Sequence, residues 1–119
     1  MKPRVLLVED DQSVRTALER GLRSAGVDID LAATLQDAMA KLEGHTVVLA
    51  DLDLPDGQST ALLRKVREMG WSIRVAIVTG SLNGGGVVRA SSERPDAFFE
   101  KPFDLRCLLE WITREKKES

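Results

Sequence analysis

Short apolar runs alternate along this chain with segments in which apolar residues recur every three or four positions. The runs predict strands, and the segments between them predict amphipathic helices. Because residues 5–8 contain no polar side chain, they predict a strand that is covered on both faces, as in a parallel sheet. The predicted strands are residues 5–8, 27–32, 46–50, 73–78 and 97–100. The predicted helices are residues 12–25, 35–42, 62–69, 87–92 and about 104–112.

Strict alternation of strands and helices in 119 residues predicts a single α/β domain over residues 1–119. Right-handed crossovers then give one parallel sheet with helices on both faces. The small doubly wound solution is the flavodoxin-like (βα)5 three-layer sandwich, with strand order 2-1-3-4-5. Three consecutive glycines at residues 84–86 predict that the fourth helix is short or irregular.

Composition excludes several classes of protein. The chain has 17 basic and 19 acidic residues, a net charge of −2, which gives no global attraction to nucleic acid or to an anionic membrane. Its single cysteine, Cys107, excludes an internal disulfide and fits a reducing compartment. The apolar run at residues 5–8 is too short for a signal peptide, and we expect a cytoplasmic protein.

Acidic residues follow the first and third predicted strands directly. Glu9 and Asp10 end the first strand, and Asp51 and Asp53 end the third. These strands are neighbours in the predicted order, so their carboxylates converge at one edge of the sheet and repel one another unless a cation relieves them. Mg²⁺ prefers such oxygen ligands, and neither histidine nor cysteine lies at these strand ends to favour zinc.

Two further polar residues follow the remaining strands at this edge. Thr79 ends the fourth predicted strand, and Lys101 follows the fifth. A metal ion, a lysine, a hydroxyl and a carboxylate are the groups that neutralise and position a phosphoryl group during its transfer. The residues therefore predict phosphoryl transfer to a carboxylate.

Four motifs in this order resemble the receiver domains of two-component response regulators, and the resemblance covers essentially the whole chain. They are VLLVEDD at residues 5–11, VLADLDLPDG at 48–57, AIVTG at 76–80 and FFEKPF at 98–103. Each motif lies at the end of the strand at which the family carries it. The combination is far more specific than any one motif alone.

The resemblance implies a phosphoacceptor and a metal site. Asp51 is expected to take a phosphoryl group from a phosphohistidine on a sensor histidine kinase or a phosphotransfer protein. Asp10 and Asp51 are expected to bind Mg²⁺ directly, Glu9 through a water molecule, and Asp53 through its backbone carbonyl. The acidic side chain of Asp53 is also expected to face the site and to alter the lifetime of the phosphoryl group.

The resemblance also implies a conformational switch rather than an enzyme that turns over a substrate. Thr79 is expected to be the switch hydroxyl, Lys101 the cation that pairs with the phosphate, and Phe98 the aromatic switch residue. Phosphorylation adds roughly −1.5 to −2 charge and three acceptor oxygens at Asp51. In this family the fourth helix, fifth strand and fifth helix then present a changed face to a downstream protein or a C-terminal output domain. A homodimer is a further expected partner state, whereas direct binding to nucleic acid or membrane is not expected.

Several conspicuous residues have simpler interpretations. Asp11, Thr34 and Asp104 precede predicted helices and are expected to be N-caps. His45 precedes the third strand, at the end away from the acids, and is expected to be exposed. Trp111 lies off the apolar stripe of the last helix, and an exposed tryptophan there suggests a partner contact.

Three alternative functions stay open. A Mg²⁺-dependent phosphatase of the haloacid dehalogenase type shares the pattern Asp51-x-Asp53 with a later threonine and lysine, although it places that pattern on its first strand. A toprim module pairs a glutamate after its first strand with a later Asp-x-Asp, but gives Thr79 and Lys101 no role. A receiver-like binding module that no longer uses phosphate is the third.

Overall fold

The central sheet has five parallel strands in the order β2-β1-β3-β6-β7. The computed structural model describes residues 3–80 and 90–114. The strands of this sheet are β1 (Arg4–Val8), β2 (Asp28–Ala32), β3 (Val47–Asp51), β6 (Arg74–Thr79) and β7 (Ala97–Glu100). These are the five predicted strands, and numbered along the chain their order is 2-1-3-4-5, so the predicted fold class is confirmed.

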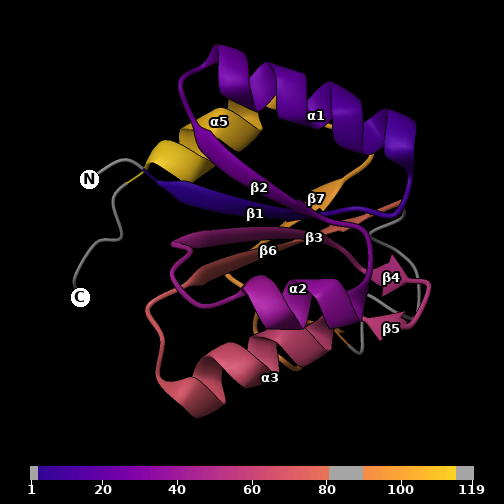
Figure 1. Cartoon of the computed structure of the whole chain (residues 1–119), viewed down its shortest axis with the longest axis vertical. Helices are drawn as coiled ribbons and strands as arrows, with labels where there is room; N and C mark the ends of the chain where they lie inside the picture. The colour runs from indigo at the N-terminus through magenta and orange to yellow at the C-terminus, as the bar shows by residue number, and fades with distance from the viewer. Residues whose placement is uncertain (1–2, 81–89, 115–119) are drawn as a thin grey trace.

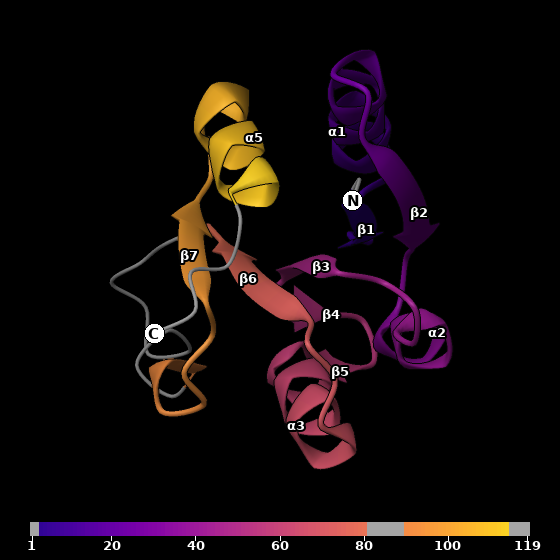
Figure 2. The same ribbon diagram turned by 90° about the vertical axis from the view of Figure 1, so that its left-hand side faces the viewer.

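Helices cover both faces of this sheet. They are α1 (Gln12–Ser24), α2 (Leu35–Lys41), α3 (Thr60–Met69) and α5 (Leu105–Thr113). Figures 1 and 2 show α1 and α5 on one face and α2 and α3 on the other. Of the predicted helix at residues 87–92, positions 87–89 lie outside the described residues, and residues 90–91 are helical. In the described ranges, none of these helices is long and apolar enough to cross a membrane.

Alternate side chains of the strands build two separate cores. Leu6 and Val8 of β1 point toward α2 and α3, whereas Val5 and Leu7 point toward α1 and α5. All four side chains are at most 2% exposed. Burial on both faces explains why the strand contains no polar residue.

Each predicted N-cap makes the expected hydrogen bond. The carboxylate of Asp11 accepts from the amides of Ser13 and Val14. Thr34 Oγ1 accepts from the Asp37 amide at the start of α2, and Asp104 accepts from the Arg106 amide at the start of α5. These contacts satisfy amides that have no partner within the helix.

A small hairpin follows β3 that the sequence did not predict. Its strands β4 (Asp53–Leu54) and β5 (Gly57–Gln58) pair antiparallel, with Asp53 opposite Gln58. Two residues a strand is too short for a recognisable alternation of polar and apolar side chains. The hairpin nevertheless shapes the loop that carries Asp53, one of the predicted site residues.

Two expectations about exposure are wrong. His45 is buried, at 8% exposure, and its Nε2 lies 2.7 Å from Asp30 Oδ2; its Nδ1 is buried and has no hydrogen-bond partner within residues 3–80 and 90–114. Trp111 is half-buried: its ring packs edge-on against Phe99, with the Arg74 guanidinium 4.5 Å from the ring centroid. Arg74 also donates to the carbonyls of Trp111 and Ile112 at the end of α5. A long-range contact with a carboxylate in the first case and ring packing in the second remove from solvent side chains that the local sequence predicted to be exposed.

Candidate functional site

Two acidic loops meet at the carboxyl edge of the sheet. β1 pairs with β3 so that Val8 lies opposite Ala50, which brings the residues after each strand together. Carboxylate oxygens of Glu9, Asp10 and Asp51 all lie within 4.8 Å of one another, and these three form the group that could hold a metal ion among the described residues. The predicted convergence of the two loops is therefore confirmed.

Glu9 is the most buried member of this group, at 3% exposure. Its Oε1 accepts a hydrogen bond from Lys101 Nζ at 2.7 Å. Its Oε2 is buried and has no hydrogen-bond partner among the described residues. A buried carboxylate oxygen without a partner is costly, so this atom is suited to accept from a ligand or from ligand-bound water.

Lys101 reaches the acids because β7 pairs with β6 at the edge of the sheet. Its backbone amide donates to the Thr79 carbonyl at 2.8 Å, which fixes the start of the loop after β7. Its ammonium lies 3.6 Å from Asp51 Oδ2, in addition to its hydrogen bond to Glu9. Burial alone would lower the pKa of Lys101, but the hydrogen bond to Glu9 and the charges of Asp51 and Glu9 outweigh it and raise the pKa. The lysine is a fixed positive charge.

Asp51 is an unusually basic carboxylate. Burial and the negative charge of Glu9 raise its pKa to about 6, although Lys101 works in the opposite direction. Its side chain is only 19% exposed. The amide of the next residue, Leu52, donates to the Val78 carbonyl at 2.8 Å, so the backbone that carries Asp51 is held against β6. A more basic carboxylate at a fixed position is suited to nucleophilic attack or to binding a metal ion.

The third acid after β1 has a different role from the first two. The Asp11 carboxylate accepts from Ser13 Oγ at 2.7 Å, besides the two amides that it caps. The hydrogen bond from the Ser13 hydroxyl is the largest cause of the lowered pKa of Asp11. Arg15, one turn into α1, donates from Nη1 to the Glu9 carbonyl at 2.7 Å. Sequence reasoning missed this contact, although a residue four positions after an N-cap points back toward the preceding loop. α1 therefore holds the backbone of Glu9 and leaves the Glu9 side chain free to face β3.

The donor set at this edge fits Mg²⁺. Mg²⁺ takes hard oxygen ligands, commonly one or two carboxylates with several waters. The group carries three carboxylates against one lysine, and the oxygen of Glu9 that has no partner adds an acceptor for a metal-bound water. The coarse prediction of an acidic pocket that could bind a divalent cation is therefore supported by the geometry.

The two predicted switch residues lie on the neighbouring strands β6 and β7. Thr79 ends β6 and is 7% exposed. Phe98 lies opposite Ile77 in the pairing of β6 with β7, and its half-buried ring packs against the core below α2 and α3. Their assignment as switch residues stays a prediction.

Asp53 lies at the margin of the site. Its side chain is exposed and accepts from Gln58 Nε2 at 3.4 Å across the small hairpin. The carboxylate thus contacts β5 and does not belong to the group of three carboxylates. The prediction for metal binding concerned its backbone carbonyl, and it stays a prediction.

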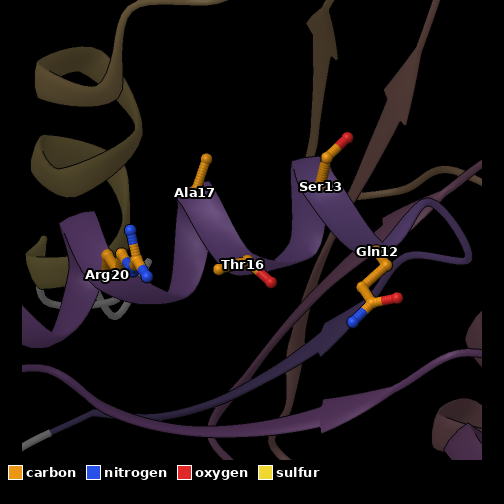
Figure 3. Close-up of a pocket in the computed structure, with 5 residues that line it drawn as sticks. All are labelled: Gln12, Ser13, Thr16, Ala17 and Arg20. Carbon is orange, nitrogen blue, oxygen red and sulfur yellow. The ribbon is translucent and has the colours of Figure 1, made fainter.

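Two hollows near α1 lie outside the group of acids. Figure 3 shows the first, along one side of α1, and it is lined by Gln12, Ser13, Thr16, Ala17 and Arg20. None of these five residues is an acid, a histidine or a cysteine. The second is mostly apolar, lies between α1 and the chain that follows β7, and includes Lys101 and Phe103.

A sequence model of one protein family matches residues 5–113 of this chain, and that family is the response regulator receiver domain. Among curated relatives, the swarming motility regulation protein RssB of Serratia marcescens is 35% identical over 107 residues. The match covers 88% of this chain and 49% of RssB. The DNA-binding transcriptional regulator NtrC of a Bradyrhizobium strain is 29% identical, with coverage of 96% of this chain and 24% of that protein.

Solved structures give the same result for the fold. A CheY-like response regulator receiver domain protein from Methanospirillum hungatei superposes with a TM-score of 0.83 at 31% identity. The superposition covers 94% of this chain and 91% of that one.

The chain spans about a quarter of the length of NtrC and about half of the length of RssB, the two curated relatives named above.

Proposed function

The chain belongs to the response regulator receiver domain family, and from that premise we propose that it is a phosphorylation-activated switch whose phosphoacceptor is Asp51. The phosphoryl donor is a phosphohistidine on a sensor histidine kinase or a phosphotransfer protein. The observation that carries the proposal is one basic carboxylate, Asp51, placed between two further acids and one lysine.

The transfer step uses the ionised form of Asp51. A carboxylate oxygen of Asp51 attacks phosphorus, the bond between phosphorus and the imidazole nitrogen breaks, and that nitrogen leaves with the electron pair. The ring nitrogen of the donor that is not bonded to phosphorus carries a proton, so the histidine leaves as a neutral imidazole, and the other product is an acyl phosphate on Asp51. With a pKa of about 6, the side chain is largely ionised at neutral pH and more nucleophilic than an ordinary aspartate.

Asp10, Asp51 and the backbone carbonyl of Asp53 would hold Mg²⁺ directly, and Glu9 would hold it through water. When bound, Mg²⁺ offsets the negative charge that gathers on the phosphoryl oxygens. Lys101 adds a second positive charge at the same place, because its ammonium already lies between Glu9 and Asp51. The chain assists both its own phosphorylation and its own dephosphorylation, and it is not an enzyme that turns over a separate substrate.

Phosphorylation then changes the balance of contacts at this edge. The three phosphoryl oxygens are stronger acceptors than the Asp51 carboxylate, and they compete with Glu9 for the Lys101 ammonium. The Thr79 hydroxyl donates to a phosphoryl oxygen, and the Phe98 ring turns toward the space that Thr79 leaves. The face formed by β7 and α5, with the fourth helix of the family, thereby changes for a partner.

The proposed partners lie on both sides of this switch. The input partner is the kinase, and the output partner is a downstream protein or an output domain, because the curated relatives RssB and NtrC are about two and four times as long. In this proposal residues 1–119 are one receiver domain, alone or as the N-terminal part of a longer regulator in the cytoplasm. A homodimer through the face formed by β7 and α5 is a further proposed state.

Intact mass after incubation with MgCl₂ and acetyl phosphate tests the phosphoacceptor. We expect the wild type to gain the mass of one phosphoryl group, and Asp51→Asn to gain none. Asp53→Asn is the matched control, because it removes an acid two positions away and should still gain the group. A chelator should abolish the gain in both competent proteins.

Other outcomes identify the alternatives. An adduct that survives in Asp51→Asn contradicts the assignment of Asp51. No adduct, together with no binding of beryllofluoride, favours a binding module that does not use phosphate. Turnover of a phosphomonoester favours the phosphatase, and metal-dependent nicking of DNA favours the toprim module.

A further inference from the structure

Asp56 lies in the turn between β4 and β5, and its carboxylate reaches a different layer of the fold. Oδ1 accepts from the Leu35 amide at 2.7 Å, and Oδ2 accepts from the Gln36 amide at 2.9 Å. Both amides belong to the first turn of α2, where they have no partner within the helix. These contacts lower the pKa of Asp56, with the Gln36 amide contributing most, so the carboxylate is ionised at neutral pH.

A second observation shows how close the loop and the helix are. Gly57, the next residue, has a φ of +148°, a conformation that side chains disfavour. A Cβ atom at Gly57 would lie 2.9 Å from Leu35 Cδ2, which is closer than such atoms approach. The pair Asp56-Gly57 therefore does two things together: it binds the helix amides and allows the backbone to lie against Leu35.

The loop that Asp56 holds is the one that begins at the phosphoacceptor. Its two ends are fixed to the sheet and to each other, since Leu52 N donates to the Val78 carbonyl at 2.8 Å and Ser59 N donates to the Leu52 carbonyl at 3.0 Å. Between these ends lies only a hairpin with two residues in each strand, which is marginal by itself. Asp53, whose backbone carbonyl is a proposed metal ligand, lies in this weakly held part.

We propose that Asp56 is a positioning residue for the phosphoacceptor site: by binding the first turn of α2 it fixes the backbone of residues 53–57 and thereby the carbonyl of Asp53. This inference rests on the proposed function and names a residue that acts through the loop without touching the phosphoryl group. Loss of such support for a ligand commonly weakens metal binding by about tenfold or more. In this proposal Asp56 has two roles: it caps the first turn of α2, and it fixes the loop that contains Asp53.

A simple helix cap is the rival interpretation, and α2 offers a matched control for it. Thr34 Oγ1 accepts from the Asp37 amide at 3.1 Å and so caps the same first turn, but it has no hydrogen bond to the loop. Thr34→Ala and Asp56→Ala should both destabilise α2. Only Asp56→Ala should release residues 53–57.

The experiment titrates ¹⁵N-labelled full chain with MgCl₂ and follows backbone amide signals, with thermal unfolding measured on the same samples. We expect Asp56→Ala to raise the dissociation constant for Mg²⁺ about tenfold, and Thr34→Ala to leave it within twofold of the wild type. Asp56→Asn is the milder second variant, because the asparagine side chain keeps one acceptor oxygen in place of the two carboxylate oxygens that bind the backbone amides of Leu35 and Gln36. It should fall between Asp56→Ala and the wild type.

Each other outcome overturns a distinct claim. If the wild type binds Mg²⁺ and Asp56→Ala binds it equally well, the positioning role is wrong while the proposed function stands. If both variants weaken binding in proportion to their loss of stability, Asp56 acts as a helix cap alone. If the wild type shows no response to MgCl₂, the metal site of the proposed function is itself wrong, and the positioning role with it.

Discussion

Two aspartates in the same sheet have opposite electrostatic environments. Asp30 of β2 accepts from His45 Nε2 at 2.7 Å and from Arg4 Nη2 at 3.4 Å, near the amino ends of β1 and β3. These contacts, with the hydrogen bond from His45 the largest, hold the pKa of Asp30 below its usual value. At the carboxyl ends, burial and Glu9 raise the pKa of Asp51 to about 6.

The difference lies in the ratio of charges. Asp30 has a histidine and an arginine as partners, so its negative charge is compensated within the chain. At the other edge three carboxylates share one lysine, and a buried oxygen of Glu9 has no hydrogen-bond partner in the part of the chain that the structure describes. A cluster with excess negative charge destabilises the fold until a cation binds, and functional sites commonly carry such a cost. The comparison separates an aspartate whose pKa is lowered by its partners from one whose pKa is raised by burial and a neighbouring acid.

Removing the lysine that contacts the Glu9 and Asp51 carboxylates should have the largest effect. Lys101→Met keeps most of the aliphatic chain but leaves the buried Glu9 carboxylate without a charge partner. We expect the free energy of unfolding to fall by about 2 to 4 kcal/mol, less than for a fully buried pair because Lys101 is partly exposed. Urea unfolding at pH 7 with a chelator measures this change.

The control for that prediction is the same substitution in a Glu9→Gln background. With the Glu9 charge gone, Lys101→Met should cost much less. Equal costs in the two backgrounds would show that packing, and not the ion pair, explains the loss.

Asp51→Asn should stabilise the protein, by about 1 to 2 kcal/mol at pH 7 without metal. A carboxyl group with a raised pKa in the folded state binds its proton more tightly there than in the unfolded chain. Its favourable contribution is therefore full below about pH 4 and is lost as pH rises through about 6. The advantage of the variant should be absent at pH 4 and complete above pH 7, as thermal unfolding across this range would record. A variant that is less stable than the wild type at pH 7 would contradict the comparison.

Asp30→Asn should have the smallest effect and the opposite sign. We expect a loss of about 0.5 to 1 kcal/mol at pH 7, since Asp30 is half exposed and solvent screens its partners. Because the folded pKa of Asp30 is lowered, its contribution is present above the unfolded value and is lost as pH falls through the folded one. Asp28→Asn, at an exposed position of the same strand, is the control and should change stability less. A gain in stability from Asp30→Asn would remove the contrast between the two edges.

The parts of the site that local sequence predicts are those that follow a strand directly. Glu9, Asp10 and Asp51 each follow an apolar run, and a parallel sheet forces the ends of neighbouring strands together. The N-caps Asp11 and Thr34 were equally predictable from the sequence, because a cap and its helix are adjacent in the chain.

The parts that could not be predicted involve contacts between distant segments. The ammonium of Lys101 hydrogen-bonds to Glu9, 92 positions away, and no local pattern encodes the choice of this acid. Asp56 and Leu35 are 21 positions apart, and their contact depends on a hairpin of two-residue strands. His45 was expected to be exposed from its place before the third strand, and its contact with Asp30, 15 positions away in β2, could not be seen in the local sequence.

The pairing of Glu9 with Lys101 has a consequence for how the protein is made. A ribosome completes β1 and Glu9 early, whereas Lys101, whose positive charge pairs with Glu9, is added 92 positions later. Until β7 docks on β6, the nascent chain holds a glutamate that cannot be buried without a large electrostatic cost. Burial of the Glu9 carboxylate at low electrostatic cost is therefore coupled to the docking of β7, at one edge of the five-stranded sheet, on β6.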